Sequence, residues 1–313
     1  MKKRYVFLAI LVGIIVLVSG LWGYRDIPLE VLKGKYANEQ SRFIFIRNMP
    51  VHFRLEGNPS DTIPLLLLHG TGASLHTWDG WVNEMQKTER ILRLDLPAFG
   101  LTGPTSDGQY SMEIFNDVVT QLLDSLGLKR VDIAGNSLGG YIAWYVALHH
   151  PERVRKLVLI DAVGYPIENT QKPIAFRLAA VPVINKIFTY ITPRFIVRNS
   201  ILDLYADKSK VSEELVNRYF ELSLRAGNRQ AFLDRARSFT PDSSYLLINA
   251  ITQPTLILWG EEDRFVPSTL ATRFHEDLPH DTLVIMPNNG HMPMEESPAA
   301  SARIVMKFLE DSQ

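Results

Sequence analysis

The sequence contains no cysteine among its 313 residues. This absence excludes a disulfide scaffold, a zinc site built on thiolates, an iron–sulfur cluster and a cysteine nucleophile. An excess of charge is also missing, because 33 basic residues face 34 acidic ones and the net charge is -1. Without a strong positive field the chain does not attract nucleic acid, so we expect no nucleic-acid partner.

Several motifs are missing as well. The sequence has no internal repeat, no low-complexity tract, no HExxH pair, no Walker loop and no zinc-ligand spacing. The glycines of the HGTGASLH segment that begins at His69 do not complete a dinucleotide fingerprint. We therefore expect neither a cofactor nor a metal. With 46% hydrophobic and 21% charged residues, disorder over the whole chain is excluded.

Charge is absent from Tyr5 to Leu21, an apolar run that follows three basic residues. As a helix, these 17 residues span about 25 Å, the short end of what crosses a bilayer. We interpret residues 1–23 as a transmembrane anchor. A cleaved signal peptide is the alternative, although an Ala-x-Ala cleavage pattern is missing, and a buried core helix is a third interpretation.

Either membrane interpretation leaves the basic end in the cytoplasm. The sequence therefore predicts a membrane-anchored protein whose catalytic domain lies outside the cytoplasm. After signal cleavage the protein would instead be secreted or periplasmic. Polar, mixed residues 24–41 are interpreted as a connector.

From residue 42 onward, strand-like runs alternate with helical patterns. Strands are expected at 43–47, 51–56, 64–68, 91–94, 131–134, 154–160, 255–259 and 282–286, and helices at 111–126, 138–149 and 297–310. This alternation predicts an α/β fold with a mostly parallel central sheet and helices on both faces.

The alternation stops between Gly164 and Ala250, where the pattern is helical and has no clear strand. We interpret residues 165–250 as a helical cap over the carboxyl edge of the sheet, where ligand sites of α/β folds lie. Residues 42–164 and 251–313 are then the two parts of the core. No feature of the sequence predicts the oligomeric state.

The strongest chemical signal is Gly135-Asn136-Ser137-Leu138-Gly139, between a short strand and a helix. Glycines on both sides of a serine allow the tight strand-to-helix turn that exposes a nucleophile, and the helix start offers N–H groups to an oxyanion. We therefore predict Ser137 as the nucleophile. An ordinary turn is the alternative.

A second signal, His69-Gly70-Thr71-Gly72, follows the apolar run at 64–68. Its small residues allow the loop to fold back beside Ser137. We predict the backbone N–H groups of Thr71 and Leu138 as the oxyanion hole and regard Gly72 as a weaker candidate. His69 is interpreted as a residue that organises this loop.

An activated serine needs a base, and the base needs an acid that orients it. Of eight histidines, His291 follows a late strand within the turn Asn288-Asn289-Gly290-His291, so we predict it as the base. Asp263, after the strand at 255–259, is the predicted acid. Its alternatives are Glu261, Glu262 and Asp161.

These motifs resemble the α/β-hydrolase superfamily, in particular the capped group of lipases, esterases and C–C-bond hydrolases. The resemblance covers about residues 42–310 and rests on HGTG at His69, DLPAFG at Asp95, GNSLGG at Gly135, GEEDRFVP at Gly260 and NNGHMPMEESP at Asn288. The chain order Ser137, Asp263, His291 is also that of the family. Ala98 stands where the family usually has glycine, and a serine at 137 disfavours dehalogenases and epoxide hydrolases, which carry aspartate there.

The resemblance implies a serine hydrolase that cleaves a carboxylic ester of a small or acyl-chain substrate. Cleavage of a C–C bond in a diketone-like substrate, as in meta-cleavage-product hydrolases, is the alternative. A non-catalytic membrane protein on the same fold is a third possibility, against which the complete set of Ser, His and Asp argues. Residues 171–202 have five basic and no acidic residues, typical of either a membrane-touching lid or a cap with a solvated basic rim. We favour the rim.

Overall fold

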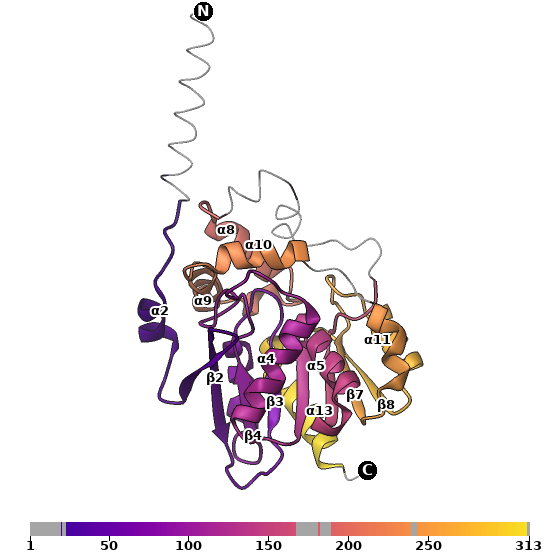
Figure 1. The fold of residues 1–313 in the computed structure, drawn as a ribbon. Helices are drawn as coiled ribbons and strands as arrows, with labels where there is room; N and C mark the ends of the chain where they lie inside the picture. Colours follow the sequence, from indigo (N-terminus) through magenta and orange to yellow (C-terminus); the bar gives the residue numbers. More distant parts are fainter. Residues whose placement is uncertain (1–19, 21–22, 167–180, 182–188, 239–242, 312–313) are drawn as a thin grey trace, which may run out of the picture.

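The computed structural model describes residues 20, 23–166, 181, 189–238 and 243–311. Eight strands form one sheet in the order β1-β2-β4-β3-β5-β6-β7-β8 (Figure 1). Strands β3 to β8 pair in parallel, whereas β2 is antiparallel to β1 and β4. The strands are β1 Ser41–Ile46, β2 Met49–Gly57, β3 Leu65–Leu68, β4 Arg90–Leu94, β5 Val131–Asn136, β6 Val154–Ile160, β7 Thr255–Gly260 and β8 Asp281–Met286. The predicted α/β architecture is confirmed.

Helices cover both faces of the sheet because its strands are apolar on both sides. In β3, four consecutive leucines alternate between the faces, and all four are completely buried. Leu66 and Leu68 join the core under α4 (Met112–Ser125), α5 (Leu138–His149) and α11 (Thr269–Asp277). Leu65 and Leu67 join the core under α3 (Asp79–Met85) and α13 (Pro298–Glu310).

The cap lies over the carboxyl edge of the parallel strands, as expected (Figure 1). Its described helices are α8 (Arg194–Leu202), α9 (Glu213–Ser223) and α10 (Asn228–Ser238). Alternating apolar and charged residues give α9 one buried face, which carries Val216 and Phe220. The remaining cap residues 167–180, 182–188 and 239–242 lie outside the described part of the chain.

The expected connector contains structure of its own. Residues Leu29–Tyr36 form α2, and Leu32 on this helix is buried with Leu101 and Leu222. Before α2, Gly23 forms an antiparallel bridge with Ile191, and Ile27 bridges to Arg225. We call residues 23–27 the strap, because they join the start of the chain to the cap.

None of the helices in the described residues has the length and apolarity needed to cross a membrane. The predicted transmembrane segment, residues 1–23, lies outside the described residues except for Gly20 and Gly23. The anchor therefore stays a prediction from the sequence.

Candidate active site

Ser137 stands on a strained turn between β5 and α5. Its φ of 56° and ψ of -116° are rare for a residue with a side chain. Its N–H donates to the Ile160 carbonyl and its own carbonyl accepts from Val163 N–H, so the end of β6 and the loop that follows it hold the turn. A Cβ at Gly135 would overlap the Gly139 carbonyl, which explains why glycine is required at that position.

The loop after β3 folds beside Ser137, as predicted. His69 is fully buried, with Nδ1 2.7 Å from the Gly70 carbonyl and Nε2 accepting from Leu96 N–H at 2.9 Å. These contacts support its predicted role in organising the loop, and burial lowers its pKa. Thr71 lines the same cavity as Ser137, while Leu138 begins α5 directly after it. The two predicted oxyanion donors thus belong to adjoining segments.

His291 lines the cavity and contacts Asp263, which lies behind it. His291 Nδ1 lies 2.7 Å from Asp263 Oδ2, and both residues are buried. The second oxygen of Asp263 accepts from the N–H groups of Phe265 and Val266, which fix the carboxylate on its loop. The Asn136 amide donates to the His291 carbonyl at 3.0 Å and so ties the histidine loop to the serine turn.

The alternative candidates for the catalytic acid differ in their exposure to solvent. Glu261 and Glu262 are exposed, whereas Asp161 is completely buried beside Asp263. Burial, followed by the neighbouring charge of Asp263, raises the pKa of Asp161 well above its ordinary value. Asp161, Asp263 and His291 have the donor types of a metal site and lie close together, but His291 and Asp263 are already bonded to each other.

Asp95 supports the loops around the site. Its oxygens accept from Leu75 N–H and Leu101 N–H and lie 2.7 Å from His52 Nδ1. His76, in contrast, is not among the residues that line the cavity. It is buried at the Tyr36 carbonyl instead.

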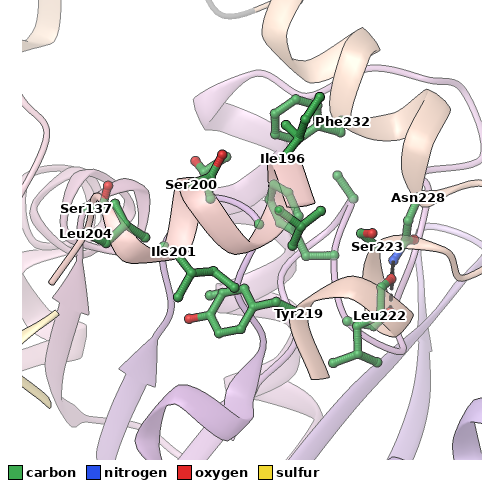
Figure 2. Close-up of a pocket in the computed structure, with 18 of the residues that line it drawn as sticks. Ser137, Ile196, Ser200, Ile201, Leu204, Tyr219, Leu222, Ser223, Asn228 and Phe232 are labelled. Carbon is green, nitrogen blue, oxygen red and sulfur yellow. Dashed lines mark hydrogen bonds between the residues drawn. The ribbon is translucent and has the colours of Figure 1, made fainter. Parts of the chain in front are cut away.

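A cavity of about 200 Å³ joins the core residues Ser137, His291 and Thr71 to the cap (Figure 2). The cap side of its wall is predominantly apolar. That part consists of Pro193, Ile196, Val197, Ile201, Leu204, Tyr219, Leu222, Phe232 and Leu233, together with Thr192, Ser200, Ser223, Asn228 and Arg229. Arg229 is the only lysine or arginine among the described lining residues, and it pairs with Asp26 of the strap at 2.6 Å.

Sequence reasoning missed most of this wall. Within the predicted cap, the large apolar residues Phe176, Leu178, Ile187 and Phe188 lie outside the described residues, while Val181 and Ile191 do not line the cavity. It also missed Arg235, whose guanidinium donates to Thr71 Oγ1 at 2.6 Å. The amphipathic spacing of α8 was the available signal for the wall.

Comparison with known proteins agrees with this geometry. A model of the alpha/beta hydrolase fold matches residues 63–298. The chain belongs to the α/β-hydrolase family. This hydrolase is 30% identical over 259 residues to the 2-hydroxymuconate semialdehyde hydrolase of Pseudomonas sp. strain CF600, covering 80% of this chain and 87% of the relative.

Two solved structures give the same picture of the hydrolase. The meta-cleavage product hydrolase of Pseudomonas fluorescens IP01 has a TM-score of 0.75 and 26% identity, covering 87% of this chain and 98% of the other. A thermophilic esterase from Thermogutta terrifontis has a TM-score of 0.70 and 25% identity, covering 83% and 93%. Hydrolase activity is therefore supported.

Proposed function

We propose that the protein is a serine hydrolase that cleaves esters of apolar acyl chains. Ser137 Oγ attacks the ester carbonyl while His291 accepts its proton, and Asp263 holds the imidazole in the required tautomer. The N–H groups of Thr71 and Leu138 stabilise the oxyanion. The alcohol leaves with a proton from His291, and water activated by His291 then releases the acid from Ser137.

The composition of the cavity wall is the observation that carries this proposal. The wall beyond Ser137 is built from aliphatic and aromatic side chains of α8, α9 and α10 (Figure 2). Burial of an acyl chain there is favoured by about 0.8 kcal/mol for each methylene. Arg229, the only lysine or arginine among the described lining residues, pairs with Asp26, and the nearby Arg235 guanidinium donates to Thr71 Oγ1, so both cations already have partners.

C–C bond cleavage is the second candidate function, and the relatives are the observation that favours it. Their names specify a muconate semialdehyde and meta-cleavage products as substrates. A muconate carries a carboxylate, and binding that carboxylate in an apolar cavity requires a compensating cation. Arg229 would then have to exchange Asp26, or Arg235 its contact with Thr71, for the substrate, a requirement that ester hydrolysis does not impose.

Two assays with one pair of proteins test the proposal. Separate samples of wild-type protein and of Ser137→Ala are incubated with a fluorophosphonate probe, with p-nitrophenyl esters and with a vinylogous diketone. We expect labelling and ester turnover only in the wild type, with turnover lower by several orders of magnitude in Ser137→Ala. Turnover of the diketone without ester turnover would replace the first candidate by the second.

We also propose that residues 1–23 anchor the protein in a membrane, with the hydrolase domain outside the cytoplasm. The strap supports this, because it joins the end of the apolar run to the cap beside the cavity. Full-length protein should remain in the membrane pellet after a high-salt wash, and a variant lacking residues 1–22 should be released with its esterase activity intact. A mature N-terminus near Leu21 would instead establish a cleaved signal.

A further inference from the structure

Asp161 ends β6 directly behind the predicted catalytic acid. Its φ of 45° lies in the left-handed region, which among residues other than glycine is adopted mainly by asparagine and aspartate. One carboxyl oxygen, Oδ1, accepts from Gly260 N–H at 2.9 Å. The other, Oδ2, is buried without a hydrogen-bond partner among the described residues that meets ordinary geometry.

The neighbours of Asp161 are ionisable groups from three other segments. An oxygen of Asp161, an oxygen of Asp263 and a ring nitrogen of His291 all lie within 4.8 Å of one another. Glu296 of α12 (Pro293–Glu296) is the next acidic group whose charge acts on Asp161. It accepts from the N–H groups of Gly290, Ala206 and Asp207.

Of the two adjacent aspartates, only Asp263 has enough hydrogen-bond donors to stabilise a negative charge. Asp263 accepts two backbone N–H groups and contacts His291, and such donors stabilise a carboxylate. Asp161 has one backbone donor, no cationic partner among its described contacts, and complete burial. Because two buried carboxylates side by side repel each other, the proton stays on Asp161, consistent with its raised pKa.

We propose that Asp161 is a positioning residue, which as a neutral carboxylic acid donates Oδ2–H to the Asp263 carboxylate and holds that carboxylate against His291. This inference rests on the proposed function, since it concerns the acid that orients the proposed base. The hydrogen bond gives the orphaned oxygen a partner. It also spreads the negative charge of Asp263 over two carboxyl groups, which moderates the attraction of Asp263 for protonated His291.

Two substitutions separate a neutral donor from a second anion. In Asp161→Asn, the amide oxygen accepts from Gly260 N–H and the amide nitrogen replaces Oδ2–H, and asparagine tolerates a positive φ. Asp161→Gly also tolerates that backbone but removes the donor. The rate constant of Ser137 labelling by a fluorophosphonate is measured for wild type and both variants between pH 5 and 9, together with the thermal unfolding midpoint.

We expect Asp161→Asn to label within about twofold of the wild-type rate and to keep the wild-type acid limb, where His291 takes up a proton. Asp161→Gly should label at least tenfold more slowly, with its acid limb at higher pH because Asp263 then attracts the imidazolium more strongly. A purely structural role would lower the unfolding midpoint without moving either acid limb, and would overturn the proposal.

Other outcomes overturn it as well. An acid limb that moves to lower pH in Asp161→Asn would show that Asp161 carries a negative charge, and this readout decides even if Asp161→Gly does not fold. Wild-type rates in both folded variants would exclude a positioning role. Wild-type protein that is not labelled would overturn the proposed function itself, and the inference with it.

Discussion

The predicted catalytic residues sit on core loops that backbone hydrogen bonds fix in place, whereas the cap meets the same cavity with apolar side chains on helices. Ser137 is held by Ile160 of β6 and by Val163 in the loop that follows, and Asp263 by two N–H groups. Ile196 and Phe232 of the cap line the cavity and are only partly buried. The difference suggests that the core determines the chemistry and the cap the choice of substrate.

The largest loss of activity is expected when Asp263, the predicted catalytic acid of the core, is changed. Asp263→Asn should lower ester turnover by about 10⁴-fold, because the amide favours the wrong imidazole tautomer. The KM should change little, since Asp263 is not among the lining residues of the cavity. Steady-state kinetics on a p-nitrophenyl ester measure both quantities.

Glu262→Gln is the matched control for this variant. Glu262 neighbours Asp263 in sequence but is exposed, so its turnover should equal that of the wild type. A loss of turnover in Glu262→Gln comparable to that in Asp263→Asn would contradict the assignment of the acid.

Low pH should destabilise the core through its buried histidines, whereas the cap has no histidine to protonate. Burial lowers the pKa of His76 to about 4, while an unfolded histidine titrates near 6.5. The unfolded state therefore binds more protons between these values, and the free energy of unfolding should fall by roughly 3 kcal/mol as pH drops from 6.5 to 4. His69 adds a loss in the same direction, whereas residues 165–250 contain no histidine.

Urea unfolding at pH 7.5, 5.5 and 4 measures this slope. The variant His76→Gln keeps a polar side chain at the Tyr36 carbonyl and cannot gain a proton in this range, so its slope should be clearly smaller. Equal slopes in the two proteins would mean that His76 is not responsible for the acid sensitivity.

A change in the cap should alter selectivity without removing activity. In the wild type, kcat/KM should rise from p-nitrophenyl acetate to medium-chain esters. Each two additional methylenes should raise it roughly tenfold until the cavity is full. Ile196→Asp introduces a charge into the wall and should flatten this rise while leaving acetate turnover near the wild-type value. Val31→Asp, on the exposed face of α2, is the control and should keep the rise. A wild-type trend that falls steadily from acetate onward would refute an acyl pocket.

The smallest expected effect concerns the strap. Asp26→Asn removes a partly exposed ion pair with Arg229 and should lower the free energy of unfolding by up to about 1 kcal/mol at low salt, and by less in 1 M NaCl. Glu30→Gln, which removes an exposed pair with Lys33 on α2, should cost less. If the two variants are equally stable, the strap pair contributes nothing to holding the cap.

Most of the core could be predicted from the sequence because its signals are local. Apolar runs such as Leu65–Leu68 and Val154–Ile160 form strands within a residue or two of the expected bounds. The serine turn was predicted from its glycines, since close backbone approach leaves no alternative there. The choice of Asp263 followed from its place after a strand.

The parts that escaped prediction depend on contacts between distant residues. The proximity of Asp161 and Asp263 arises because β6 and β7 are neighbours in the sheet, and local patterns do not reveal the order of the strands. The polar stretch 24–41 showed no strong periodicity, yet it forms α2 because Leu32 packs against the core and cap. The cavity wall likewise depends on how three helices are oriented.

The strap also constrains the order in which the protein can be assembled. Ile27 exchanges backbone hydrogen bonds with Leu224 and Ala226, so about 200 residues must be synthesised after the strap before its partners exist. At about 5–20 residues per second, the strap waits roughly 10–40 s on a translating ribosome. The strap therefore reaches its place only after most of the cap has been made, and a fusion partner attached before it would be carried to the side of the cap.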